Sequence, residues 1–495
     1  MKTRMKSRKK KLRDKYYAIP VQVRASFWFL FCLVMQRGIS ILTTPIFTRL
    51  LATSEYGQYT VFNSWMDIVS IFITLRLYYG VFVQGLVKYN DDKEQYASSM
   101  QGLGLVLSLA WTIVYLIAHN FWNRLFKLTT VQMLAMLIMI WATGAFRFWA
   151  STQRNEYKYK LLVLVTIIVS IMKPVIGVIL VIYSDDKATA RILGLAVAEL
   201  IGYSWCFFIQ IKRGKKFFSK KYWKHALMFN IPLIPHYLSQ AVLSSSDRIM
   251  IRNMVGASEA GIYGLAYSLS KIMSMINQAL NQTFSPYAYR KLKENKAEDI
   301  SSIGLFMLAI IGVANLMLIA FAPELVYVFA PKEYFDAIWI IPPVAMSVYF
   351  TFAYSLFALV EFYYEKTKLI LVASLVSAVL NIILNYFLIR KYSYFAAGYT
   401  TLFCYIMYAI FHYIFMRRIC KTQIKDVDIY HSNKLFCLTL CFLIMGMAFL
   451  FSYKYTMIRY SLIVLILSAC YYFRKSIINQ GKNVLKLRQK NSKHS

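Results

Sequence analysis

Apolar residues occur along the chain in blocks of about 20 with few charged residues, and short polar segments separate the blocks. A helix rises about 1.5 Å per residue, so a block of this length crosses the hydrocarbon core of a membrane. A membrane β-barrel would show short segments of alternating polarity, and the sequence has none. The pattern predicts an all-α polytopic membrane protein with about 14 transmembrane helices. The predicted spans are residues 25–47, 58–83, 99–119, 131–151, 161–183, 188–211, 226–254, 260–285, 300–322, 334–361, 367–389, 394–416, 434–453 and 456–473.

Charged segments between the predicted spans divide the chain into two lobes and their flanking parts. Pro232 and Pro235 provide a kink site within the long span 226–254. The predicted organisation is a basic cytoplasmic N-terminal segment (1–24), a first lobe of six helices (25–211), a basic cytoplasmic linker (212–225), a second lobe of six helices (226–417), a cytoplasmic loop (418–433), two further helices (434–473) and a basic cytoplasmic tail (474–495).

The distribution of positive charge predicts the topology. The formal net charge is +35, although only 16% of the residues are charged. Roughly 40 Lys and Arg lie on the side that holds both termini and about 10 on the other, which places both termini in the cytoplasm of a bacterial inner membrane. No folded basic module accompanies the charge, so we expect anionic membrane lipids as partners and no nucleic acid.

The chain lacks the sequence signatures of an enzyme. It has no Gly-rich phosphate loop, no HExxH motif and no Asp-rich cluster, and its seven cysteines lack zinc spacing. We therefore predict a non-enzyme with no catalytic residue, cofactor or metal. The run Ala25–Phe47 is too long for a signal-peptide core and is predicted to remain as the first anchor. Of the scattered histidines, His236 could titrate or simply form a hydrogen bond.

A short sequence recurs at equivalent places in the two lobes. Ser-Glu-x-Gly-x-Tyr occupies residues 54–59 after the first span and returns 204 residues later at 258–263, after the seventh. Because six helices separate the copies, both halves cross the membrane in the same direction, which is one of the known transporter repeat designs. Each copy also fits a helix start, where a hydroxyl group caps free N–H groups and an acid favours the positive helix end.

Several charged residues fall within the predicted spans, where a charge at the bilayer centre costs roughly 2.5–3.5 kcal/mol. Those close to the midplane are Arg37, Asp67, Lys173, Glu199 and Lys271. Asp247 and Arg248 lie in the outer half of the seventh span, while Arg76 and Arg147 lie towards the cytoplasmic ends of theirs.

These charges allow two interpretations. In the first, a water-filled cavity with positive walls receives an anionic substrate, because guanidinium groups match phosphate oxygens. In the second, Arg37 pairs with Asp67 and Lys173 with Glu199, and these pairs only lock helices together. Arg76 and Arg147 could also extend to the cytoplasmic headgroups. Asp247 and Arg248 are about 100° apart on their helix and do not face one another well, and Lys271 has no acid at its depth unless Asp247 reaches it. Arg248 and Lys271 are therefore the better candidates for contacting a substrate.

Two regions of the chain match a known pattern. The first contains Gln36-Arg37-Gly38 and the run from Thr44 to Tyr59. The second contains the run from Ile231 to Ser239, then Ser246 to Ile251, and Gly261 to Lys271. Both regions resemble Wzx-type polysaccharide flippases, and the similarity in pattern extends through the twelfth span.

This resemblance implies membership of the multidrug/oligosaccharidyl-lipid/polysaccharide exporter (MOP) superfamily, with two six-helix lobes in a V shape around a central cavity. The implied substrate is an oligosaccharide on polyprenyl diphosphate, moved from the inner to the outer leaflet by alternating access for O-antigen or capsule assembly. Arg37, Arg248 and Lys271 match the cationic positions expected to meet the diphosphate, and Asp247 matches a coupling or orienting acid. The polysaccharide polymerase machinery is a further implied partner, and the last two helices would be an extension.

Four other functions remain open from the sequence, and the charges within the spans argue against one of them, a non-transporting scaffold. A cation-coupled multidrug exporter of the same fold needs acidic cavity residues, whereas intramembrane bases outnumber acids here. A lipid II flippase would share both the fold and the cationic cavity. A polysaccharide polymerase would need a sizeable outward loop, and no predicted outward loop exceeds roughly 15 residues.

Overall fold

The structure of the protein is a computed structural model that describes residue 16 and residues 19–424, 427–475 and 478–479. Most of the predicted N-terminal basic segment and of the C-terminal tail lies outside these residues.

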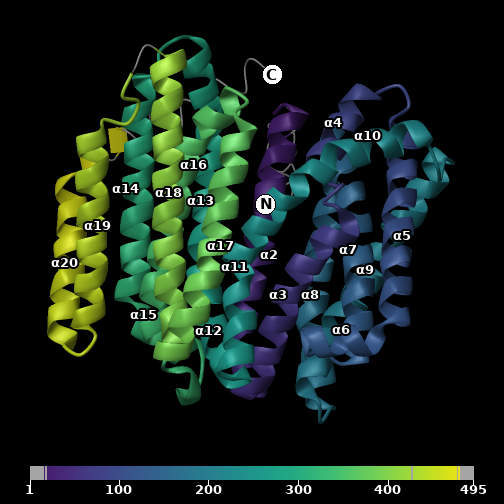
Figure 1. Cartoon of the computed structure of the whole chain (residues 1–495), viewed down its shortest axis with the longest axis horizontal. Helices are drawn as coiled ribbons and strands as arrows, with labels where there is room; N and C mark the ends of the chain where they lie inside the picture. The colour runs from purple at the N-terminus through teal and green to yellow at the C-terminus, as the bar shows by residue number, and fades with distance from the viewer. Residues whose placement is uncertain (1–15, 17–18, 425–426, 476–477, 480–495) are drawn as a thin grey trace, which may run out of the picture. The chain divides into compact units, whose positions relative to one another are not determined.

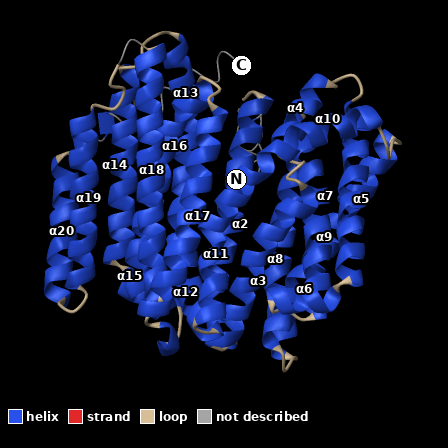
Figure 2. Ribbon diagram, in the orientation of Figure 1, coloured by secondary structure: helices blue, strands red, loops and turns tan. Residues whose placement is uncertain are grey.

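The described residues form α-helices and two short 3₁₀ helices, without a β-strand (Figure 2). The elements are α2 (Val21–Leu50), α3 (Thr53–Thr74), α4 (Gly80–Lys88), α5 (Lys93–Ile117), α6 (His119–Phe126), α7 (Thr130–Asn155), α8 (Tyr159–Ile182), α9 (Lys187–Gly214), α10 (Lys220–Asn230), η1 (Ile231–Leu233), α11 (Ile234–Met254), α12 (Ala257–Ser270), α13 (Ile272–Lys293), α14 (Asp299–Ala320), α15 (Ala322–Phe329), η2 (Lys332–Tyr334), α16 (Ala337–Tyr363), α17 (Thr367–Tyr392), α18 (Phe395–Gln423), α19 (Ser432–Ser452) and α20 (Thr456–Tyr472).

Ten of the described helices are long and apolar enough to cross a membrane, which confirms the predicted all-α polytopic class. They are α2, α5, α7, α8, α9, α14, α16, α17, α18 and α19. Helices α3, α11 and α13 reach similar lengths but carry more polar residues, and α20 has only 17 residues. The predicted number of 14 spans is therefore approximate, because polar side chains lower the apolar character of several helices.

The chain divides into two compact units. The first contains residues 1–50 and 65–234, and the second contains residues 51–64 and 235–495. The start of α3, predicted as part of the first lobe, thus belongs to the second unit. Conversely, α10 overlaps the predicted cytoplasmic linker and packs within the first unit, where the indole N–H of Trp223 donates a 2.9 Å hydrogen bond to the carbonyl oxygen of Ser99.

In the first unit, α9 packs against α5, α7 and α8 (Figure 1). Helices α8 and α9 are in close contact at Gly177 and Gly194, where a β-carbon on Gly194 would overlap the backbone of Gly177. Small residues allow membrane helices to gain van der Waals contact along their backbones, which compensates for the lack of a hydrophobic driving force in lipid. The two glycines therefore hold α8 and α9 together.

In the second unit, α16 is the central helix. It packs against α12, α13, α14 and α18, and 83% of its apolar stretch is buried, against 33% for α17 and α19. Its side chains Tyr349, Phe352 and Leu356 belong to the main apolar core of this unit. The last two helices, α19 and α20, pack against α14 and lie at one edge of Figure 1.

Residues 58–83, predicted as one span, are interrupted in the structure. Helix α3 ends at Thr74, and a turn over residues 75–79 precedes α4. Leu75 and Arg76 take φ values of 48° and 49° in this turn, a left-handed conformation that ends the helix. One end of this predicted span is therefore a turn, which holds Arg76.

Two spans of the second half are interrupted as well. Residues 226–254 form α10, η1 and α11, because Pro232 and Pro235 lack the N–H groups that a continuous helix requires. Residues 260–285 are divided between α12 and α13, and Lys271 lies at the break. The kink predicted from the two prolines is thus a change of helix.

The two copies of the Ser-Glu-x-Gly-x-Tyr sequence contact each other within the second unit. The hydroxyl group of Thr53 donates a 3.1 Å hydrogen bond to that of Ser258. A β-carbon on Gly57 would overlap the carbonyl oxygen of Ala257, and one on Gly261 would overlap the carbonyl oxygen of Thr53. The contact is reciprocal, since each copy places its glycine against the start of the other copy's helix. The sequence repeat is therefore also a structural contact between α3 and α12.

We predict that Gly57→Ala destabilises the protein, because the added β-carbon meets backbone atoms that cannot move independently of α12. Overpacking of this kind costs about 1–3 kcal/mol. The control is Gly38→Ala on α2, where a β-carbon has no neighbour within 4 Å and the substitution favours the helix by about 0.5–1 kcal/mol. Thermal unfolding of the purified protein in detergent should show a lower Tm for Gly57→Ala only. Equal Tm values for the two variants would contradict the close contact.

Candidate functional site

A small polar pocket lies in the first unit between α3, the turn after it, and α7. Its cavity volume is about 60 Å³, which is room for a few water molecules or a small anionic group. Helix α3 supplies residues spaced three and four positions apart, so that they share one face, and α7 does the same. The pocket is lined by Met66, Asp67, Ser70, Thr74, Tyr78, Met139, Ile140, Thr143, Gly144 and Arg147.

Arg147 lies at this pocket with an exposed side chain. Its Nη1 donates a 2.6 Å hydrogen bond to the hydroxyl oxygen of Tyr78, and its guanidinium carbon lies 4.6 Å from the centre of the same ring. A tyrosine face attracts a cation without neutralising its charge. Arg147 therefore remains able to bind an anion.

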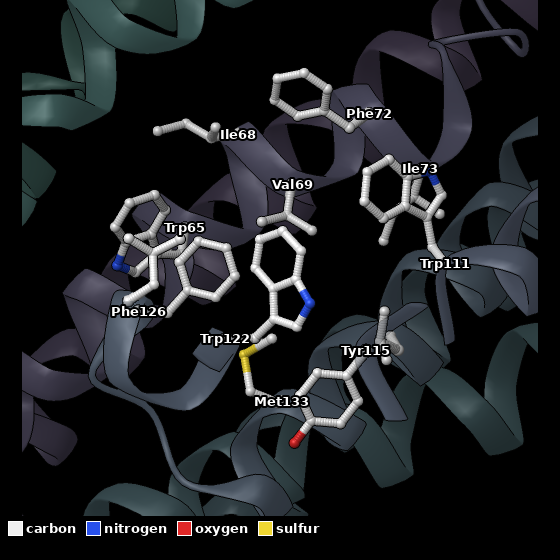
Figure 3. A pocket seen from close by; sticks show the side chains of 12 residues that line it. Trp65, Ile68, Val69, Phe72, Ile73, Trp111, Tyr115, Trp122, Phe126 and Met133 are labelled. Atoms are coloured by element: carbon white, nitrogen blue, oxygen red, sulfur yellow. The ribbon is translucent and has the colours of Figure 1, made fainter. Parts of the chain in front are cut away.

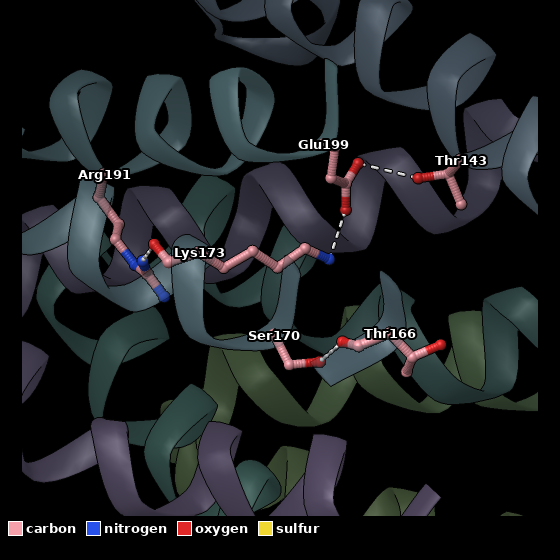
Figure 4. Close-up of polar contacts among 6 residues, drawn as sticks. All are labelled: Thr143, Thr166, Ser170, Lys173, Arg191 and Glu199. Carbon is pink, nitrogen blue, oxygen red and sulfur yellow. Dashed lines mark hydrogen bonds and ion pairs between the residues drawn. The ribbon is translucent and has the colours of Figure 1, made fainter. Parts of the chain in front are cut away.

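Lys173 and Glu199 form an ion pair behind the pocket. Lys173 Nζ lies 2.6 Å from Glu199 Oε1, and the hydroxyl group of Thr143 donates a 2.8 Å hydrogen bond to Glu199 Oε2 (Figure 4). Arg191 donates a 3.3 Å hydrogen bond from Nη1 to the carbonyl oxygen of Lys173. The pair joins α8 to α9, and Thr143 connects it to the pocket wall. Lys173 is thus matched by an acid and acts as a helix contact in this structure.

In the second unit, Arg248 and Lys271 share one aromatic ring. The guanidinium carbon of Arg248 lies 4.1 Å from the centre of the Tyr267 ring, and Lys271 Nζ lies 4.8 Å from it. Arg248 is buried and donates hydrogen bonds of 2.7 Å to the hydroxyl oxygen of Ser64 and 2.6 Å to the carbonyl oxygen of Ser244. Lys271 is exposed. Of the two predicted substrate contacts, only Lys271 is accessible here, because protein groups satisfy the Arg248 guanidinium.

Asp247 is fully buried and accepts hydrogen bonds from three other helices. Its Oδ2 accepts 2.7 Å bonds from the hydroxyl groups of Tyr263 and Thr401, and its Oδ1 accepts a 2.8 Å bond from Asn385 Nδ2. A buried carboxylate is tolerated when such donors replace its hydration. The arrangement joins α11, α12, α17 and α18 around one charge.

The remaining predicted residues lie elsewhere in the first unit. Arg37 is exposed on α2, and the backbone N–H of Arg76 donates a 3.2 Å hydrogen bond to the Thr74 hydroxyl oxygen in the turn after α3. Asp67 lines the polar pocket together with Arg147. The five predicted cations are thus distributed over both units, and the structure brings Arg147 together with Asp67, and Arg248 together with Lys271.

The sequence reasoning did not identify the uncharged partners of these charges. Tyr78, Thr143, Tyr263, Asn385 and Thr401 each donate or accept a hydrogen bond at one of the charged sites. Helical spacing was the available signal for one of them, because Thr143 and Arg147 lie four residues apart on one face of α7. The others come from helices far apart in the sequence, so their contacts require the packed structure.

A second pocket of the first unit is apolar and larger, at about 290 Å³. It is lined by Trp65, Ile68, Val69, Phe72, Ile73, Trp111, Tyr115, Trp122, Leu125, Phe126, Met133 and Leu137, from α3, α5, α6 and α7 (Figure 3). Trp65 and Trp122 both pack against Phe126, with ring centres 4.5 and 5.7 Å apart. The lining has no charged side chain, so this pocket suits an apolar group and not a phosphate.

Apolar helices in two units, with charged and hydrogen-bonded groups inside the helices, define a multi-pass membrane protein. Comparison with solved structures gives the same class. The lipid II flippase MurJ, in an inward closed conformation, is similar with a TM-score of 0.68, at 14% identity, over 92% of this chain and 100% of that one. An inward-facing multidrug resistance MATE family transporter of the MOP superfamily is similar with a TM-score of 0.63, at 13% identity, over 79% and 96%. At these identities the likeness concerns the fold alone.

Sequence comparison identifies the family. The chain belongs to the polysaccharide biosynthesis protein family, whose model matches residues 23–290. A protein of the Lsg locus of Haemophilus influenzae is 28% identical over 212 residues, which are 40% of this chain. The matched stretch spans about half the length of that relative, 52%. An uncharacterized membrane protein of the same species is 21% identical over 69% of this chain and 84% of its own. Membership of this family and fold agrees with the resemblance to Wzx-type flippases.

We predict that removing one partner of the Lys173–Glu199 pair destabilises the protein, and that removing both restores most of the loss. Breaking a buried pair costs about 3–5 kcal/mol, and the expected loss for Glu199→Ala is about 2–3 kcal/mol because the Lys173 side chain is 25% exposed. Unfolding of Glu199→Ala and of Lys173→Met/Glu199→Met in detergent measures both effects.

The matched control is the Lys291–Asp299 pair, which has the same 2.6 Å separation but an Asp299 side chain that is 51% exposed. Asp299→Ala should cost at most about 1 kcal/mol, since water screens this pair. If Asp299→Ala and Glu199→Ala cost the same, the Lys173–Glu199 pair does not hold α8 to α9.

Proposed function

We propose that the protein is a flippase that moves a polyprenyl-diphosphate-linked oligosaccharide from the inner to the outer leaflet of a bacterial plasma membrane, by alternating access, for surface polysaccharide assembly. Membership of the polysaccharide biosynthesis protein family and the MOP transporter fold support this function. The number of Lys and Arg on each side supports cytoplasmic termini, because positive loops stay on the cytoplasmic side.

The observation that carries the proposal is the exposed Arg147 at a polar pocket within otherwise apolar helices. Its guanidinium has a tyrosine ring and hydroxyl as its described contacts, so its charge is available for the diphosphate. Arginine binds phosphate oxygens through two parallel hydrogen bonds, which are strong where water is scarce. A cation inside a membrane helix is costly, and such residues usually serve a transported ion or substrate.

Lys271 and Arg248 extend the same argument to the second unit. Lys271 would contact the diphosphate, while Arg248 would hold Tyr267 in place. Asp247 would be the coupling or orienting acid, with its three hydrogen-bond donors fixing its position. The pocket beside Arg147, at about 60 Å³, is too small for a sugar residue, so the oligosaccharide requires the protein to open. The apolar tail can remain in lipid.

Two related functions make different predictions. A multidrug exporter would recognise cationic drugs through accessible acids, whereas the exposed acid of the polar pocket, Asp67, shares that pocket with Arg147, and the exposed charged residue of the second unit, Lys271, is a base. A drop in cationic-dye accumulation on expression would favour that function. A lipid II flippase would restore peptidoglycan synthesis in cells depleted of their own. The flippase proposed here would instead restore a surface polysaccharide that disappears on deletion of the gene.

We predict that Arg147→Ala and Lys271→Ala reduce surface polysaccharide about tenfold or more, which corresponds to the loss of one charge-assisted contact of about 1.5–3 kcal/mol. Arg248→Ala should also impair export, through the position of Tyr267. The measurement is surface polysaccharide in a deletion strain, normalised to the amount of variant in the membrane.

The matched control is Arg390→Ala at the end of α17. Arg390 lies 4.1 Å from the ring centre of Tyr386, the same distance as Arg248 from Tyr267, but close to the predicted outer surface. This control should export normally. Normal export by Arg147→Ala and Lys271→Ala, at normal membrane levels, would refute the cationic substrate site.

A further inference from the structure

Glu361 and His412 form a buried pair in the second unit that the proposed substrate site does not use. Glu361 lies in the last turn of α16 and His412 lies on α18, and both side chains are 0% exposed. His412 Nδ1 lies 2.7 Å from Glu361 Oε1. Helices α16 and α18 share the most extensive contact of any two helices described, and the pair lies within this contact.

Each member of the pair has one polar atom without a partner. Glu361 Oε2 and His412 Nε2 are buried and have no hydrogen-bond partner among the described residues. A buried polar atom without a partner costs about 1–3 kcal/mol, and more when its group is charged. With the Nδ1–H of His412 donating to Glu361, both of these atoms are acceptors. A proton is therefore the ligand that this pair lacks.

Among the described residues, aromatic side chains pack against His412. The rings of Tyr354 on α16 and Tyr408 on α18 lie 5.5 and 4.6 Å from the His412 ring, centre to centre. On α11, the nearest titratable group is His236, whose Nδ1 lies 3.2 Å from the hydroxyl oxygen of Ser374 on α17. Within the described residues, no lysine or arginine side chain contacts Glu361 or His412.

The first basic residues that follow Glu361 and His412 in the sequence are Lys366 and Arg417. Arg417, further along α18, lies 3.6 Å from Asp428 and donates a 3.1 Å hydrogen bond to the carbonyl oxygen of Val427. Lys366 contributes only its backbone N–H, which donates a 2.8 Å hydrogen bond to the carbonyl oxygen of Glu361. The charge of the pair therefore depends on its own protons.

We propose that Glu361 and His412 form a proton-binding site that takes up and releases one proton during transport. With a carboxylate and a neutral imidazole the pair carries one negative charge in an apolar core, which is unfavourable. One proton from water, added at His412 Nε2 or Glu361 Oε2, makes the pair neutral and removes that cost. The deprotonated pair favours a looser contact between α16 and α18 that admits water, and the protonated pair favours the packed arrangement. By the predicted topology, the last turn of α16 lies at the cytoplasmic side, so the proton exchanges with the cytoplasm.

This proposal deepens the proposed function, since it names a coupling ion for the transporter, and part of its test does not require transport. Infrared spectra of the purified protein, recorded during a pH titration in detergent, detect carboxyl and imidazole protonation. We expect a pH-dependent carboxyl or imidazole band in the unmodified protein that is absent in Glu361→Gln and in His412→Gln. Asp428→Asn is the matched control and should keep this band. If the band is absent from the unmodified protein, or persists in both pair variants, the proton site is refuted.

The coupling is tested in vesicles that contain the protein and a fluorescent polyprenyl diphosphate bearing one N-acetylhexosamine. A pH gradient should change the rate of movement of this lipid several-fold in the unmodified protein and in Asp428→Asn. Glu361→Gln should lose the response to the gradient and keep movement without a gradient within about twofold. Movement that ignores the gradient in the unmodified protein, or a response retained by Glu361→Gln, overturns the coupling. A pair-dependent infrared band without any movement of the lipid would instead support the proton site and count against the proposed function. Size-exclusion profiles of the variants, compared with that of the unmodified protein, show whether each one folds.

Discussion

The cost of placing a charge inside apolar helices is the constraint on which the rest of this structure depends. Several charges within the spans have a specific environment: an acid for Lys173, three neutral donors for Asp247, hydroxyl and carbonyl oxygens for Arg248, and tyrosine rings for Arg147 and Lys271. These environments are not equivalent. An ion pair neutralises a charge, whereas a tyrosine ring holds a cation in place and leaves its charge available. The distinction separates residues that hold helices together from residues that can meet a substrate.

The same constraint explains why some predicted spans are less apolar than a typical membrane-spanning helix. The second, seventh and eighth predicted spans carry the polar groups and the helix breaks, whereas α14 and α16 are strongly apolar. The repeat adds a second requirement, because the two Ser-Glu-x-Gly-x-Tyr copies approach so closely that only glycine fits at Gly57 and Gly261. Polar groups within the helices and close contact between the copies occur on the same elements, α3 and α12. In the proposed function, α3 and α12 connect the residues that contact the substrate to the conformational change of alternating access.

Much of the fold could be predicted from the sequence, because long apolar blocks and the prolines at 232 and 235 act locally. The repeat and the charged positions could also be identified, since they depend on residue types at fixed spacings. The sequence could not tell that Arg248 is buried against Ser64 while Lys271 is exposed, because this depends on how distant helices pack. It also did not identify the Glu361–His412 pair, whose members are 51 residues apart on different helices. The place of residues 51–64 in the second unit likewise follows from tertiary contact alone.

The most direct test of the account is whether the purified protein moves a lipid-linked sugar across a membrane. The protein would be reconstituted in vesicles with a polyprenyl diphosphate that carries a short labelled oligosaccharide, and an impermeant glycosidase would report how much of the label reaches the outer surface. The account predicts that glycosidase releases label from the inner-leaflet pool in vesicles that contain the protein, and that inner-leaflet label stays protected in protein-free vesicles. Equal protection in both would contradict the central claim that this membrane protein is a lipid-linked oligosaccharide flippase.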